Sequence, residues 1–119
     1  MLGIIGAMDT EVAKLKELMT EVDVTQAASM EFYQGKLNGR EAVVVRAGIG
    51  KVNAACCTQV MIDHFPVRCV INTGIAGSLR AEIDIGDIVL ATDAIEHDMD
   101  VAVFGYAPGQ VPGLDVDAF

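Results

Sequence analysis

The sequence contains no tryptophan, and aromatic residues make up only 5% of its 119 residues. Proteins that bind single-stranded nucleic acid by stacking need aromatic side chains, so this class is disfavoured. Lysine and arginine are also scarce, numbering 8 against 17 aspartates and glutamates, for a formal net charge of −9. Such a charge repels phosphate backbones and anionic lipid. We therefore expect neither a nucleic acid nor a membrane as a partner.

Long apolar runs and a targeting segment are missing as well. No apolar stretch approaches the roughly 18 residues that a membrane-spanning helix needs, and the first residues contain no basic region or cleavage pattern. The three cysteines, Cys56, Cys57 and Cys69, do not form a C-x-x-C pair. We predict a cytoplasmic protein whose thiols are reduced and buried.

What the sequence has is apolar residues, which make up 52% of a chain long enough for one domain. Apolar residues at helical spacing, with charged residues between them, predict a helix over residues 9–22, and a second, largely buried helix is predicted over 51–65. Between these helices, Asn38-Gly39 is typical of a type I′ turn, and so predicts an antiparallel hairpin. The predicted strands span residues 2–7, 31–37, 41–47, 67–72 and 86–95, of which 67–72 is expected to be covered on both faces; residues 104–113 are expected to form a loop. This order is typical of an α/β fold with a mixed sheet.

Three segments rich in small residues follow predicted strands, at positions 6–8, 48–51 and 73–77. Open α/β sheets bind ligands at the carboxyl ends of their strands, where small residues let a ligand approach the backbone. Neither common nucleotide motif is present, because Val45 and Val52 break the P-loop pattern and Asn53 breaks the dinucleotide pattern. The three segments together favour a different kind of ligand cleft.

Glu11 is the candidate catalytic residue suggested by its position in the first turn of the predicted helix. A carboxylate there can act as a general base aimed at the cleft, or can simply complement the helix dipole, and its position alone leaves both readings open. The residues that most resemble metal ligands, Glu96, His97, Asp98 and Asp100, have no repeated histidine spacing. We expect no metal and no cofactor.

Taken together, several segments resemble the bacterial 5′-methylthioadenosine/S-adenosylhomocysteine nucleosidases, of the purine nucleoside phosphorylase-like superfamily. The resemblance runs in order along nearly the whole chain, and it rests on Glu11 and on residues 3–8, 48–52, 71–77, 86–89, 104–106 and 110–113. It implies a three-layer α/β/α fold with a mixed central sheet. It also implies that residues 1–119 form a single incomplete domain, the N-terminal half of such an enzyme.

The resemblance implies a homodimeric enzyme of methionine salvage that hydrolyses the N-glycosidic bond of the two nucleosides. The products are adenine and a thio-ribose, and Glu11 activates the attacking water. Ile75 stands where some members have serine, which removes a hydroxyl from the site. The other implied site residues are Ala7, Met8 and Ile49 on the ribose side, Ile75, Ala76 and Gly77 near the base and the water, and Val101, Phe104 and Pro112 in the partner subunit's pocket.

In the family, the acid that protonates adenine and the groups that bind the ribose hydroxyls belong to the second half, which has no counterpart here. We therefore expect the isolated chain to be weakly active or inactive, and to associate with itself or with a separate second half. Two alternatives stay open. One is a non-catalytic nucleoside-binding or dimerisation fragment, and the other is a nucleoside phosphorylase or a futalosine-type hydrolase of the same fold.

Overall fold

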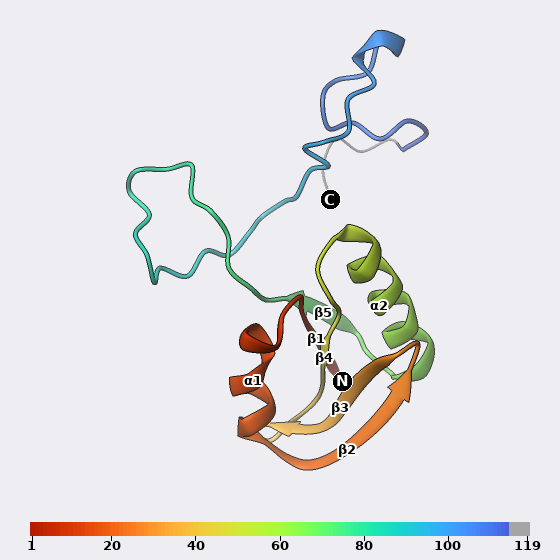
Figure 1. Cartoon of the computed structure of the whole chain (residues 1–119), viewed down its shortest axis with the longest axis vertical. Coiled ribbons are helices and arrows are strands. Elements are labelled where there is room, and N and C mark those ends of the chain that lie inside the picture. The colour runs from red at the N-terminus through yellow and green to blue at the C-terminus, as the bar shows by residue number, and fades with distance from the viewer. Residues whose placement is uncertain (115–119) are drawn as a thin grey trace. The chain divides into compact units, whose positions relative to one another are not determined.

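A computed structural model describes residues 1–114, and the chain divides into two compact units, Met1–Gly77 and Ser78–Phe119. The first unit holds a five-stranded sheet and both α-helices (Figure 1). In chain order its elements are β1 (Leu2–Gly6), α1 (Asp9–Leu18), β2 (Met19–Ala27), β3 (Met30–Leu37), β4 (Arg40–Arg46), α2 (Lys51–His64) and β5 (Cys69–Asn72). No helix within residues 1–114 is both long and apolar enough to cross a bilayer.

The sheet is mixed, as predicted, with the strand order β2-β3-β4-β1-β5. β1 lies between β4 and β5 and is parallel to both, whereas β2, β3 and β4 form an antiparallel meander. The β3–β4 turn confirms the hairpin prediction, because Asn38 and Gly39 both have positive φ, at 49° and 76°. A type I′ turn requires positive φ at both central positions.

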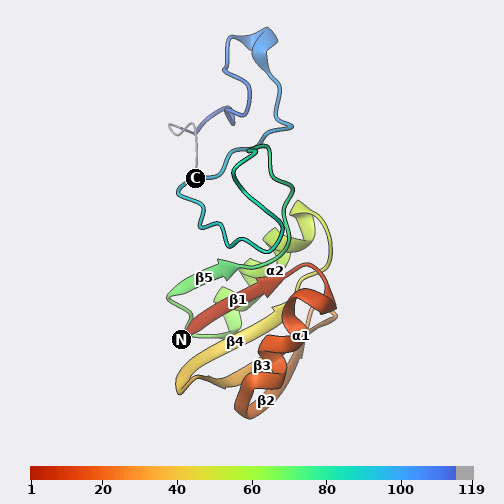
Figure 2. The same cartoon turned by 90° about the vertical axis from the view of Figure 1, so that its left-hand side faces the viewer.

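The two helices cover opposite faces of the sheet, which gives the predicted three layers (Figure 2). Successive residues of a strand point to opposite faces, so β1 and β4 contribute to two separate apolar clusters. On the α1 face the buried residues are Ile4, Val12, Met19 and Val44. On the α2 face they are Ile5, Phe32, Val43, Val45, Ala47, Cys57, Met61 and Phe65. Because residues on both of their faces are buried, β1 and β4 form the centre of the core of this unit.

The first helix ends earlier than its apolar spacing predicts. α1 stops at Leu18, and the residues from Met19 onward form β2, a strand that the sequence analysis missed. Met19 is buried as predicted, but as the first residue of the strand, and Val22 is 42% exposed. The physical reason is tertiary: the segment is rich in β-branched residues, and β3 offers it a hydrogen-bonding edge that a further helical turn cannot use.

Burial around α2 and β5 is also lower than predicted. Only Cys57 and Met61 of α2 are buried, and β5 is an edge strand whose Cys69 and Ile71 are exposed. The expectation that β5 is covered on both faces is therefore wrong for the described residues: Val70 packs against the cluster on the α2 face, but nothing among residues 1–114 covers Cys69, Ile71 and Asn72. The thiols are free, as predicted, but only Cys57 is buried.

Residues 78–114, the described part of the second unit, consist of turns, loops and one short 3-10 helix, η1 (Ala102–Phe104). Residues 86–95, predicted as a strand, form no strand here, and Ile88 and Leu90 are 89% and 87% exposed. Apolar, β-branched residues form a strand only where a neighbouring strand accepts their hydrogen bonds, and none within residues 1–114 pairs with this segment.

Candidate active site

Three loops meet at the carboxyl edge of the parallel strands, as the sequence analysis predicts. The Thr73 N–H donates to Ile5 O at 2.8 Å, which continues the β1–β5 pairing to the start of the loop after β5. On the other side of β1, the Ala47 N–H donates to Gly6 O, also at 2.8 Å. The loops that follow β1, β4 and β5 therefore leave the sheet side by side.

Glu11 lies in the first turn of α1, and its carboxylate joins two of these loops. Its Oε2 accepts a hydrogen bond from the Met8 N–H at 2.9 Å, and its Oε1 accepts one from the Ile75 N–H at 3.3 Å. The first bond is a helix-capping interaction, since the side chain satisfies a backbone donor just before the helix. The second bond spans 64 positions of sequence and ties the helix to the loop after β5.

These hydrogen bonds favour the charged form of the carboxyl group. The pKa of Glu11 lies below its ordinary value of 4.5, chiefly because the Met8 N–H donates to the carboxylate. Partial desolvation opposes this effect, and hydrogen bonding from the Ile75 and Ala7 backbones adds to it. At neutral pH the loops therefore hold an ionised carboxylate with unused acceptor capacity, which can accept a hydrogen bond from a water molecule or stabilise a nearby cation.

The other residues predicted for the substrate side lie on the same three loops. Ala7 and Met8 are half-buried beside Glu11, and Ile49 is 73% exposed in the loop after β4. Ile75 is 85% exposed, and Ala76 and Gly77, which follow it, are exposed too. Position 75 contributes to the site through its backbone N–H, so having isoleucine in place of serine leaves that donor in place. The surface next to the carboxylate is open on the side of these residues.

Val101, Phe104 and Pro112 belong to the second unit. Val101 precedes η1, Phe104 is the last residue of η1 and Pro112 lies in the following loop. Phe104 is 76% exposed. Their assignment to a partner subunit's pocket stays a prediction.

One ion pair at this edge escaped the sequence analysis. Arg46, the last residue of β4, has its Nε 3.3 Å from Oδ1 of Asp9, the first residue of α1. The charges in the sequence could have predicted this pair. Arg46 ends a strand, Asp9 begins the helix that follows the neighbouring parallel strand, and their charges are opposite. Both side chains are largely exposed, so the pair contributes little to stability.

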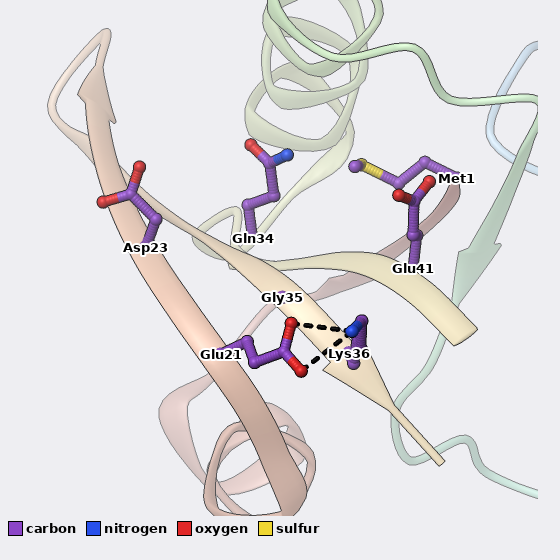
Figure 3. A pocket seen from close by; sticks show the side chains of 7 residues that line it. All are labelled: Met1, Glu21, Asp23, Gln34, Gly35, Lys36 and Glu41. Atoms are coloured by element: carbon purple, nitrogen blue, oxygen red, sulfur yellow. Dashed lines mark hydrogen bonds and ion pairs between the residues drawn. The ribbon is translucent and has the colours of Figure 1, made fainter. Parts of the chain in front are cut away.

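A depression on the sheet lies away from this edge and is lined by none of the predicted site residues (Figure 3). Its lining residues are Met1, Glu21, Asp23, Gln34, Gly35, Lys36 and Glu41. Lys36 Nζ lies 2.7 Å from Glu21 Oε2, so one of the three acidic residues that line the depression forms an ion pair with another lining residue. Across residues 1–114, no group of three or more histidine, cysteine, aspartate or glutamate side chains is arranged to hold a metal ion.

Comparison with known proteins gives consistent matches. A family model described as the phosphorylase superfamily matches residues 1–119. The chain is 44% identical over 117 residues to a 5′-methylthioadenosine/S-adenosylhomocysteine nucleosidase of Staphylococcus haemolyticus, covering 98% of this chain and 51% of that protein. It is 50% identical over 112 residues to the nucleosidase of Geobacillus kaustophilus, covering 94% of this chain and 48% of that protein.

Solved structures agree in fold. The nucleosidase of Colwellia psychrerythraea in complex with adenine has a TM-score of 0.91 and 49% identity, over 93% of this chain and 46% of that one. The nucleosidase of Neisseria meningitidis in complex with methylthio-immucillin-A has a TM-score of 0.90 and 45% identity, over 95% of this chain and 49% of that one. The chain thus spans about half the length of the curated relatives it matches.

Proposed function

Because this chain belongs to the phosphorylase superfamily, we propose that it carries the water-activating half of a nucleosidase site. The reaction is hydrolysis of the N-glycosidic bond of 5′-methylthioadenosine and S-adenosylhomocysteine, which releases adenine and a thio-ribose. The similar proteins of Staphylococcus haemolyticus and Geobacillus kaustophilus are named for this activity, and the similar structure from Colwellia psychrerythraea holds adenine.

The observation that carries the proposal is the position of the Glu11 carboxylate. It lies where the loops after β1 and β5 meet, and it accepts hydrogen bonds from the Met8 and Ile75 N–H groups. Two backbone donors fix both oxygens, so the carboxylate is oriented before any substrate arrives. A carboxylate that merely complemented the helix dipole would not need the second bond, which comes from a distant loop.

Hydrolysis of the N-glycosidic bond requires two contributions from the Glu11 carboxylate. As the bond to adenine breaks, the ribose gains positive charge, and an ionised carboxylate nearby stabilises that charge. A water molecule must also be held and must lose a proton as it attacks the anomeric carbon. The lowered pKa of Glu11 guarantees the ionised form but makes the group a weaker base. Electrostatic stabilisation and orientation of water are therefore its larger contributions.

The remaining roles rest on the family resemblance, and for the residues on the three loops also on their position. Small and apolar side chains at these positions suit the uncharged faces of a nucleoside. Ala7, Met8 and Ile49 line the ribose side, Ile75, Ala76 and Gly77 line the side of the base and the water, and Val101, Phe104 and Pro112 close the alkylthio end of a partner subunit's pocket.

We further propose that residues 1–119 are one half of the catalytic domain, in a homodimeric cytoplasmic enzyme. The chain spans about half the length of the curated relatives it matches, and no strand within residues 1–114 pairs with the outer edge of β5, so more strands can add there. The second half would supply the acid for adenine and the groups for the ribose hydroxyls. Since such groups act jointly, the 119-residue chain alone has little or no turnover.

The test is a chimera that joins residues 1–119 to the part of the Geobacillus kaustophilus relative beyond its matched half. Adenine release from methylthioadenosine in H₂¹⁸O should place ¹⁸O on the sugar product. Glu11→Gln should reduce kcat by roughly 100-fold or more, the scale of a lost acid–base group. Glu17→Gln is the matched control, because Glu17 lies on the same helix and is exposed beside Lys14.

The alternatives give different results in the same assay. A phosphorylase would release adenine only with phosphate and would form a sugar phosphate without ¹⁸O. A non-catalytic fragment would bind methylthioadenosine in the chimera without releasing adenine. Equal activity of the Glu11→Gln and Glu17→Gln variants would show that Glu11 is not the water-activating residue.

A further inference from the structure

Position 74, two residues after β5, is a glycine, and its backbone conformation does not require one. Unlike seven other glycines of the described chain, it does not have a positive φ, so any residue type could adopt its backbone geometry. The space around it is the constraint. A Cβ atom at position 74 would lie 2.6 Å from Glu11 Oε1 and 3.0 Å from Glu11 Cδ.

We propose that Gly74 is a positioning residue for Glu11: because it has no side chain, the next backbone N–H, that of Ile75, reaches the carboxylate and fixes its orientation. The Ile75 N–H bonds the same oxygen, Oε1, that a Cβ at position 74 would displace. Gly74 thus decides whether the loop after β5 can contact the carboxylate at all. This inference deepens the proposed function and rests on it for the catalytic meaning of the position of Glu11.

A methyl group at position 74 acts on the carboxylate more than on the fold. The atoms it would meet are at the far end of a flexible side chain, which can swing away without moving the backbone. Oε1 then loses the Ile75 N–H, whereas Oε2 can keep its bond to the Met8 N–H. Backbone N–H donors lower the pKa of this carboxyl group and desolvation raises it, so loss of the Ile75 donor should be visible in its titration.

Two other glycines show that this constraint is specific. A Cβ at Gly6 would lie 2.6 Å from Cγ1 of Val12, a fully buried residue that cannot swing away, so that position constrains the fold. A Cβ at Gly77, in the same loop as Gly74, would meet nothing within 4 Å. Gly77→Ala is therefore the matched control for Gly74→Ala.

The experiment follows the backbone amide resonances of the ¹⁵N-labelled 119-residue chain across the carboxylate range, about pH 2 to 7. In the unmodified chain, the amides of Met8 and Ile75 should both titrate with Glu11, and Glu11→Gln should remove both inflections. Gly74→Ala should remove the inflection at Ile75, keep the one at Met8 and raise its midpoint. Gly77→Ala should leave both unchanged.

The inference is overturned if the Ile75 amide of Gly74→Ala titrates as in the unmodified chain. A Gly74→Ala chain that does not fold is tested in a Glu11→Ala background, where the obstructing carboxylate is gone. Recovery of the fold there supports the inference, and failure in both backgrounds overturns it. These outcomes do not involve turnover, so a chimera that lacks activity while the titrations behave as expected refutes the proposed function and leaves the positioning role intact.

Discussion

The junction between β1 and α1 offers a sharp test of packing, because it combines a glycine with a fully buried valine. Gly6 ends β1, and Val12 is 0% exposed on the inner face of α1, against Ile4 and Val44. A Cβ atom at position 6 would lie 2.6 Å from Val12 Cγ1. Valine in a helix strongly prefers one rotamer, so it cannot rotate away cheaply. Gly6→Ala should therefore destabilise the unit.

The expected losses of stability are estimated first for Gly6→Ala and Val12→Ala separately. Overpacking by one methyl group costs roughly 1–3 kcal/mol. Val12→Ala removes two buried methyl groups, at about 0.8 kcal/mol each plus a cavity term, for roughly 2–3 kcal/mol. In the double variant, the new methyl group takes up space that Val12 Cγ1 has left. The combined loss should therefore be smaller than the sum of the single losses by about 1–2 kcal/mol.

Urea unfolding followed by circular dichroism measures all four chains of this cycle. With an m value of about 1 kcal/mol/M, a coupling of this size corresponds to roughly 1–2 M in the unfolding midpoint. Gly77→Ala serves as the control and should change stability by less than about 0.5 kcal/mol, since nothing lies near its added Cβ. Losses for Gly6→Ala and Val12→Ala that add to within about 0.5 kcal/mol would refute the packing argument.

Three further predictions concern charge, backbone and thiols. Folding lowers the pKa of Glu11, so the ionised carboxylate should stabilise the fold fully above its ordinary pKa of 4.5. This stabilisation should be lost as the pH falls through the lower pKa of the folded state. The free energies of unfolding of the wild type and Glu11→Gln, measured in urea, should therefore become equal at acidic pH. Gly39→Ala should cost about 1–2 kcal/mol because its φ is 76°, and an unchanged melting midpoint would contradict the type I′ turn. Burial raises the pKa of Cys57 to about 11, so a thiol reagent should modify Cys56 and Cys69 rapidly and Cys57 only on unfolding; three equal rates would contradict this.

Local signals account for the parts of the fold that were predicted well. The Asn38-Gly39 turn was predicted because its positive φ angles are a property of the residues themselves. The start of α2 at Lys51 and its end before Phe65 follow in the same way from the Gly50 and Pro66 that flank it. These features depend on a few neighbouring residues, so no distant part of the chain could change them.

The errors concerning strands occur where contact with a distant segment decides the outcome. β2 formed because β3 offered it an edge, although its first residues continue the helical spacing of α1. Residues 86–95 have the composition of a strand, but no neighbour among residues 1–114 accepts their hydrogen bonds. β5 was expected to be covered on both faces, but three of its four residues are exposed because no described segment packs over them. In each case the composition of the segment was interpreted correctly, but the neighbouring segment that it would contact could not be predicted.

In the candidate site, too, some features are encoded locally and others depend on contacts between distant residues. The sequence by itself determined that Glu11 sits in a helix's first turn and that small residues follow three strands, because both features are encoded locally. Only the tertiary structure decided that the Ile75 N–H donates to this carboxylate and that Gly74 leaves room for it. Those two contacts join residues more than sixty positions apart, and they exist because β1 and β5 pair in parallel, so that the two loops leave the sheet at the same edge.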